Sequence, residues 1–153
     1  MRGAFTQLYV HIIWATWDRL PLITETIRPR LYGAIAKKAR AMKCDPLAIG
    51  GTADHVHLLV RLHPTVPIAE LVRQIKGATS HLITHEICPG GFFRWQGAYS
   101  AFTLRQSEVP SLRAYIRRQE EHHASGTTDK EWEVLPKRQD GIKAAAEGRL
   151  GNP

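Results

Sequence analysis

The order of strand-like and helix-like segments along the chain places the strongest constraint on its fold. Four short segments rich in β-branched and aromatic residues predict strands, within residues 7–17, 46–51, 55–62 and 88–104. Two segments with apolar residues at helical spacing predict helices, within residues 29–43 and 63–87. This β-α-β-β-α-β order predicts an α+β protein with a ferredoxin-like (split βαβ, RRM-like) fold, an antiparallel sheet with both helices on one face.

An extra helix is predicted after the fourth strand, over residues 107–124, with Pro110 in its first turn. The 153 residues suit one domain with a core of its own. We place that domain at residues 1–126 and expect residues 127–153 to form a C-terminal tail that is weakly structured or a short helix.

The composition narrows the class of protein. Lys and Arg number 21 against 14 acidic residues, giving a net charge of +7 and a pI near 9.8. Such a balance favours a nucleic-acid partner, because positive charge supplies the sequence-independent part of the affinity for nucleic acid. The alternative is that the charge serves only to keep the protein soluble. No apolar run approaches the roughly 18 residues of a membrane helix. No secretory pattern opens the chain, and Cys44 and Cys88 are too few for a disulfide framework, so we expect a cytoplasmic protein.

Two histidines stand two residues apart in the third predicted strand, ADHVHLLV, residues 53–60. Successive side chains of a strand point to opposite faces, so His55 and His57 share one face while Val56 and Leu58 point into the core. Two imidazoles on one face are able to converge on a metal ion. The alternative is a pair of hydrogen-bonded or solvent-facing histidines without an ion.

The extra helix carries a second group of polar residues. Tyr115 and Gln119 are four apart and therefore neighbours on one face, which His122 continues, with Arg118 and His123 near its edge. Nearby positive charge would favour the phenolate of a tyrosine, making Tyr115 a candidate nucleophile. The glutamine carbonyl oxygen is able to complete a metal's ligand set. Packing of the tyrosine and a favourable helix dipole for the histidines are the alternative explanation.

Taken together, ADHVHLLV and YIRRQEEHH resemble the His-hydrophobe-His motif and the tyrosine helix of the single-tyrosine HUH transposases of bacterial insertion sequences. Those enzymes are relatives of the REP-associated tyrosine transposases. HIIWATWDRLPLI, LVRQIKGATS and WQGAYSAF are similar to three further stretches of the family, and the resemblance covers residues 7–124 in order. The sequence departs from the family at AYSAF, where Gly-Tyr-Gly commonly precedes the Ala-Phe pair.

The resemblance implies a metal-dependent transposase and endonuclease that cleaves and rejoins single-stranded DNA at hairpin-flanked, palindromic ends. His55, His57 and Gln119 would be the ligands of a divalent ion, Mg²⁺ or Mn²⁺. Tyr115 would attack the DNA and form a covalent 5′-phosphotyrosine intermediate. The resemblance also implies a homodimer in which the tyrosine helix of one chain serves the histidine pair of the other.

We expect basic residues of the helices to bind the DNA. Arg73, Lys76 and Ser80 form a stripe on the second helix, and Lys37 and Arg118 are further candidates; a solvated helix face is the alternative. Aromatic side chains of the strands and loops are candidates for stacking on unpaired bases, or else belong to the core: Trp14, Trp17, Phe93 and Trp95.

Three other functions compete with transposition. A domesticated relative would process palindromes with the same residues and chemistry, and a hydrolytic metallonuclease would use water in place of the tyrosine. A non-catalytic RRM-like module would bind nucleic acid through aromatic residues of its strands. The third predicted strand carries histidines where that module needs stacking aromatics, and no RNP-like run is present.

Overall fold

The structure of the protein is a computed structural model, and the residues that it describes are 3–136. Its central sheet has four strands, β1 (Tyr9–Ala15), β2 (Asp45–Gly51), β3 (His55–Arg61) and β4 (Ser100–Leu104). They lie in the order β2-β3-β1-β4, and all three pairings are antiparallel. Because β1 and β3 are neighbours at the centre and β2 and β4 form the edges, the predicted split βαβ arrangement is confirmed.

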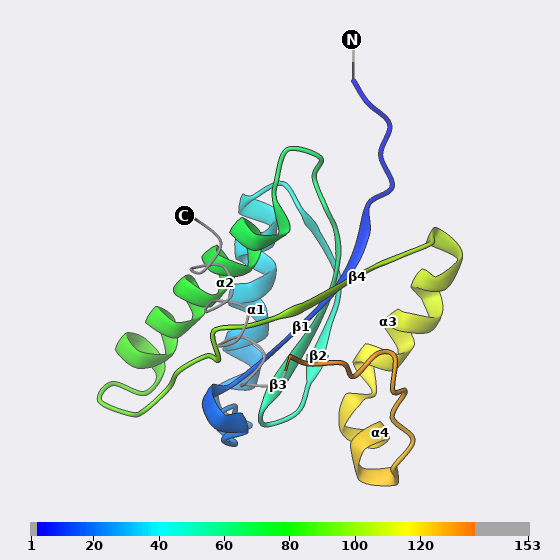
Figure 1. The fold of residues 1–153 in the computed structure, drawn as a ribbon. Coiled ribbons are helices and arrows are strands. Elements are labelled where there is room, and N and C mark those ends of the chain that lie inside the picture. Colours follow the sequence, from blue (N-terminus) through cyan, green and yellow to red (C-terminus); the bar gives the residue numbers. More distant parts are fainter. Residues whose placement is uncertain (1–2, 137–153) are drawn as a thin grey trace, which may run out of the picture.

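Two helices, α1 (Arg28–Ala41) and α2 (Ile68–Leu82), cover one face of this sheet (Figure 1). A five-residue π-helix, Ile83–Ile87, extends α2. The core between the helices and the sheet is built from alternate residues of β1 and β3, among them Ile12, Trp14, Val56 and Leu58. As expected from the alternation, Val56 and Leu58 point away from the face that carries the two histidines.

The opposite face of the sheet is covered by α3 (Val109–Arg117), which a short 3-10 turn, Gln106–Glu108, precedes, and by α4 (Gln119–Ser125) (Figure 1). A smaller core packs α3 on the sheet, with Leu112, Tyr115 and Ile116 against Tyr9 and Leu59. The extra helix is therefore present, as predicted, and it lies on the face of the sheet that α1 and α2 leave free.

The predicted continuous helix over residues 107–124 is wrong in one respect, because the structure breaks it at Arg118. The backbone angles there are φ −110° and ψ 26°, outside the helical range, and they separate α3 from α4. After the break Gln119 is buried, with 1% of its surface exposed, and its side chain contacts His55. Burial of these polar contacts overrides the local preference of the segment for one unbroken helix.

Gly50 of β2 positions the end of α3. A Cβ atom at this residue would lie 1.9 Å from the backbone oxygen of Ile116. Only glycine allows this approach of helix to strand, and the approach brings Tyr115, one residue before Ile116, over the sheet.

Residues 127–136, the described part of the predicted tail, form turns and irregular chain that return across the sheet (Figure 1); residues 137–153 lie outside the described residues. Within residues 3–136, no helix has the length and apolar character needed to cross a membrane.

Candidate active site

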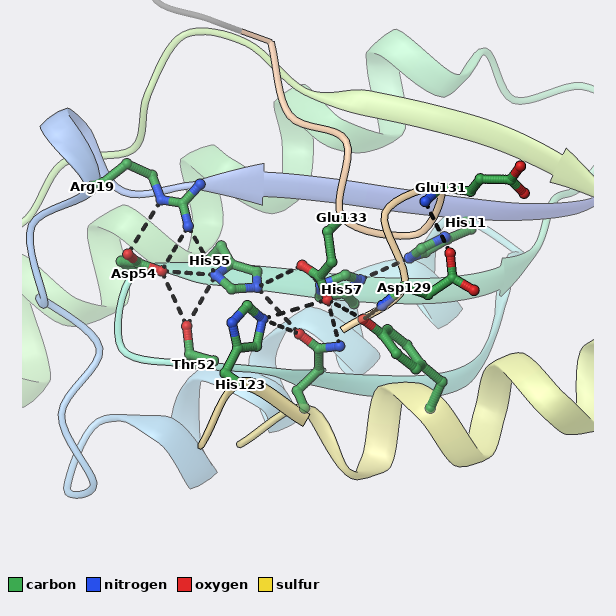
Figure 2. Close-up of polar contacts among 12 residues, drawn as sticks. His11, Arg19, Thr52, Asp54, His55, His57, His123, Asp129, Glu131 and Glu133 are labelled. Atoms are coloured by element: carbon green, nitrogen blue, oxygen red, sulfur yellow. Dashed lines mark hydrogen bonds and ion pairs between the residues drawn. The ribbon is translucent and has the colours of Figure 1, made fainter. Parts of the chain in front are cut away.

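His55 and His57 lie on β3 and face α3 and α4, as the strand alternation predicts. Both are buried, with 1% and 0% of their surface exposed. The ring centroids are 5.1 Å apart, at an interplanar angle of 64°. Each ring directs its Nε2 atom toward a carboxylate, that of Glu133, whose Oε2 is 3.4 Å from His55 and 3.3 Å from His57. Figure 2 shows the three side chains pointing toward one another.

Tyr115 on α3 and Gln119 at the start of α4 meet the same carboxylate. The Tyr115 hydroxyl donates a hydrogen bond of 2.5 Å to Glu133 Oε1, and the Gln119 amide donates one of 2.9 Å to the same oxygen. The Gln119 carbonyl oxygen lies 3.2 Å from His55 Nε2. The four site residues expected from the sequence are thus brought together, and Glu133 lies between them.

Glu133 is the functional candidate that the sequence analysis missed. It belongs to the segment assigned to the tail, and its side chain is only 15% exposed. Its neighbour Trp132 packs its ring edge on Tyr115, with centroids 4.9 Å apart, which anchors the segment over the site. The pairing of an aromatic residue with acidic ones in KEWEV is the one sequence signal, and it does not say where the chain returns.

Polar contacts fix His55 through Nδ1, the ring nitrogen that does not face Glu133. Its Nδ1 donates to Asp54 Oδ1 at 2.7 Å, and the Thr52 hydroxyl lies 2.9 Å from the same nitrogen. Arg19 pairs with the Asp54 carboxylate, its Nε 3.2 Å from Oδ2 (Figure 2). This chain of contacts fixes the ring of His55 and leaves its Nε2 facing the centre of the site.

The charges of the site shift the pKa of each group. Burial lowers the pKa of His55, but hydrogen bonds to Asp54 and Glu133 and their negative charges outweigh burial and raise it. Burial dominates at His57 and lowers its pKa. Burial would raise the pKa of Glu133, yet its contacts with both histidines and with Tyr115 hold that pKa well below its usual range. Glu133 is therefore a carboxylate at neutral pH.

Tyr115 is held as a neutral phenol. Burial first, and then its hydrogen bond to Glu133, raise its pKa from 10.0 to about 12. Its oxygen also accepts a hydrogen bond of 3.0 Å from the Asp129 backbone N–H, and its ring stacks on His122 with centroids 4.5 Å apart. The expectation that surrounding positive charge favours the phenolate is wrong for this arrangement, because the group nearest the hydroxyl is an anion.

Three of the residues expected to bind DNA lie away from this site. Arg73, Lys76 and Ser80 lie on α2, on the other face of the sheet (Figure 1). Arg73 forms an ion pair with Glu70 at 2.6 Å, while Lys76 Nζ donates to the carbonyls of Gln96 and Ala98 at 2.7 and 2.9 Å. Their DNA contacts stay predictions.

Of the other two candidates, Lys37 lines a cavity of about 350 Å³ between α1 and α2. Arg118, at the helix break, lines another of about 280 Å³ that extends to Gln119. The role of both residues in binding DNA also stays a prediction.

Most of the aromatic residues that were candidates for base stacking belong to the core. Trp14, Phe93 and Trp95 are buried, and the indole N–H of Trp95 donates to Thr79 at 3.0 Å. Trp17 lies under the guanidinium of Arg94, 4.1 Å from the ring centroid.

The family model described as "Transposase IS200 like" matches residues 4–119. The chain belongs to this family. The match ends at Gln119 and includes His55, His57 and Tyr115, whereas Glu133 lies outside the matched residues. The resemblance drawn from the sequence motifs is confirmed, and the chain is a transposase of the insertion-sequence type.

Among known proteins, the chain is 25% identical over 124 residues to the ISDra2 transposase TnpA of Deinococcus radiodurans, covering 77% of this chain and 88% of that protein. A crystal structure of a protein assigned as a transposase from the same organism superposes with a TM-score of 0.63 at 25% identity, over 78% of this chain and 95% of that one.

The structure of a REP-associated tyrosine transposase bound to a REP hairpin matches with a TM-score of 0.61 over 80% of this chain and 72% of that one. At 18% identity, this likeness shows the fold.

Proposed function

We propose that this transposase cleaves and rejoins single-stranded DNA with hairpin ends, using Tyr115 as nucleophile and a divalent metal ion bound beside it. One observation carries the proposal: the Tyr115 hydroxyl and the Nε2 atoms of His55 and His57 surround one carboxylate, that of Glu133, at 2.5 to 3.4 Å. A nucleophile and a set of metal-binding atoms thus share one buried centre.

The residues fit a divalent ion. The ligand atoms of His55, His57 and Glu133 all lie within 4.8 Å of one another, and the Gln119 oxygen adds a fourth candidate. His57 Nε2 is buried and has no hydrogen-bond partner among the described residues, since the nearby carboxylate is not aligned with it. An unpaired buried nitrogen of this kind is what a bound ion would satisfy. Mixed imidazole and oxygen ligands suit Mn²⁺, and Mg²⁺ is the abundant alternative.

When bound, a divalent ion would supply Lewis-acid stabilisation of the charge on the scissile phosphate. The chain's own residues would supply the nucleophile and the group that accepts its proton. The Tyr115 oxygen forms a bond to phosphorus while the bond from phosphorus to the 3′-oxygen breaks. The 3′-oxygen takes up a proton from water, which leaves a 5′-phosphotyrosine and a 3′-hydroxyl. The phenol must give up its proton, and Glu133 Oε1, which already accepts its hydrogen bond, is the nearest acceptor.

Rejoining reverses these bonds. A 3′-hydroxyl attacks the phosphotyrosine, the tyrosine oxygen leaves and regains a proton, and one phosphodiester replaces another. Because bonds of the same kind are exchanged, the reaction needs no nucleotide cofactor.

In the described chain the nucleophile reaches the histidines of its own sheet. Four residues of α3 are buried against that sheet, Val109, Leu112, Tyr115 and Ile116. The homodimer, with exchange of the tyrosine helix between chains, stays a prediction. Mixing Tyr115→Phe protein with His57→Ala protein tests the exchange. Cleavage by the mixture requires sites shared between two chains, and an inactive mixture indicates sites complete within one chain.

The DNA substrate is inferred from two observations. The net charge of +7 favours a polyanion, and the structure of the REP-associated neighbour is that of a protein bound to a REP hairpin.

We would test the chemistry on a denaturing gel, with labelled single-stranded oligonucleotides that carry the hairpins flanking the gene. With Mn²⁺ or Mg²⁺, we expect a slowly migrating covalent adduct. Tyr99→Phe, which changes a half-buried tyrosine of the main core, is the matched control and should keep the adduct. Tyr115→Phe and a chelator should each remove it. Cleavage without any adduct would instead indicate water as the nucleophile.

A further inference from the structure

His11, near the middle of β1, is a buried polar residue that the proposed reaction does not use. It is 1% exposed. It pairs across the sheet with Leu59, while His57 pairs with Ile13, two residues further along β1. His11 and His57 are therefore diagonal neighbours on the face that carries the site, within reach of each other's side chains.

The two rings are hydrogen-bonded. His11 Nε2 lies 2.8 Å from His57 Nδ1, and the ring planes are inclined by only 19°, with centroids 5.1 Å apart. Figure 2 shows His11 beside His57, on the opposite side from Glu133. The two nitrogens of His57 thus have different surroundings: Nδ1 has a partner in β1, and Nε2 faces the carboxylate.

A neutral imidazole carries one N–H and one lone pair, and the hydrogen bond made by one nitrogen decides which atom has the proton. For Nε2 of His57 to act as a metal ligand, its lone pair must be free, so the proton must be on Nδ1. That N–H then needs an acceptor in a buried place, and among the described residues its hydrogen-bond partner is His11. His11 accepts through Nε2 only if its own proton is on Nδ1.

We propose that His11 is a positioning residue of the metal site, which accepts the Nδ1–H of His57 and so leaves the Nε2 lone pair of His57, on the side of Glu133, free for a metal ion. The inference rests on the proposed metal-binding function. In this role His11 contacts Nδ1 of His57 as Asp54 contacts Nδ1 of His55.

The partner of His57 is an imidazole, whereas the partner of His55 is the carboxylate of Asp54, and the difference follows from burial. The Asp54 side chain is 28% exposed and is neutralised by Arg19, whereas His11 is only 1% exposed. An unpaired carboxylate at that depth would carry a large desolvation cost. A neutral acceptor such as an imidazole avoids that cost.

Substitutions at His11 separate this role from packing. Glutamine places its carbonyl oxygen near the position of the histidine Nε2 and is able to accept the same hydrogen bond. Asparagine is shorter and ends near the position of Nδ1, and leucine fills the space without an acceptor. Two readouts are needed: the tautomer of His57 in metal-free protein, from ¹⁵N NMR of labelled histidine assigned with His57→Gln, and Mn²⁺ affinity from calorimetry.

We expect the Nδ1–H tautomer of His57 in the wild type and in His11→Gln, with similar Mn²⁺ affinities. His11→Asn and His11→Leu should lose the single tautomer and bind Mn²⁺ about 10- to 100-fold more weakly, the usual effect of removing a residue that orients a ligand. If His11→Leu does not fold, the role of His11 is still tested by the His57 tautomer of the wild type and by the comparison of His11→Gln with His11→Asn.

Wild-type protein with the proton of His57 on Nε2, or a folded His11→Leu that binds Mn²⁺ as the wild type does, would overturn the role of His11 while leaving the metal site in place. Absence of Mn²⁺ binding by the wild type would overturn the metal site and this inference together.

Discussion

Raising the pH from neutral should stabilise this transposase through Lys76, whose Nζ donates to the carbonyls of Gln96 and Ala98. These contacts fasten the segment before β4 to α2. Burial lowers the pKa of Lys76 from 10.5 to about 8, so the folded protein releases this proton more readily than the unfolded chain does. Between those two pKa values the unfolded state binds more protons, and stability therefore rises with pH.

The magnitude follows from the shift. Each pKa unit is worth about 1.4 kcal/mol, and from about pH 7 to about pH 9.5 the contribution of Lys76 to the free energy of unfolding should increase by about 2 kcal/mol. Lys76→Met removes the titrating group. Its free energy of unfolding should therefore lack this part of the increase, whatever the absolute stability of the variant.

Urea denaturation of both proteins at the two pH values gives the comparison, because the other titrating groups are common to both. Lys37→Met, which changes an exposed lysine of α1, is the matched control and should follow the wild type. If the free energy of unfolding changes equally with pH in the wild type and in Lys76→Met, the pH dependence does not come from Lys76 and the reasoning is refuted. A loss of DNA affinity in Lys76→Met with no difference in pH response would favour the DNA contact predicted from the sequence.

Three further predictions concern the site and its support. Gly50→Ala should lower the free energy of unfolding by about 1–3 kcal/mol, because its Cβ would lie 1.9 Å from a backbone oxygen of α3. Gly33→Ala, in an exposed and open part of α1, should instead raise it by about 0.5–1 kcal/mol, and thermal unfolding of both variants tests this. Asp54→Asn should weaken Mn²⁺ binding about 10-fold or more in calorimetry by releasing His55, and unchanged affinity would speak against that contact. Mn²⁺ at 100 times its dissociation constant should stabilise the wild type by about 2.7 kcal/mol, and His57→Ala should show no such gain.

The sequence predicted those parts of the site that depend on local periodicity. Alternation along β3 places His55 and His57 on one face, and helical spacing makes Tyr115 and Gln119 neighbours, whatever the remainder of the chain does. The β-α-β-β-α-β order limited the sheet to few topologies, and the observed sheet has the predicted split βαβ arrangement.

The parts that were missed depend on contacts between distant segments. Glu133 reaches the site because the chain returns over α3 and Trp132 packs on Tyr115, and no spacing in the sequence encodes that return. The contact of His11 with His57 depends on strand register, which a single sequence does not specify. The break at Arg118 depends on burial of the side chain that follows it. Local pattern thus found the histidines and the tyrosine, while tertiary contact decides what surrounds them.

The central claim is that the Tyr115 oxygen forms the covalent bond to DNA, and mass spectrometry of the trapped adduct tests it most directly. The protein would be incubated with Mn²⁺ and a hairpin-flanked single strand, treated with nuclease and digested with trypsin. Cleavage after Arg113 and Arg117 releases the peptide Ala-Tyr-Ile-Arg, residues 114–117. We predict this peptide with a nucleotide attached to the tyrosine through a 5′-phosphate. Cleaved DNA with the peptide unmodified, or the nucleotide on another residue, would contradict the account.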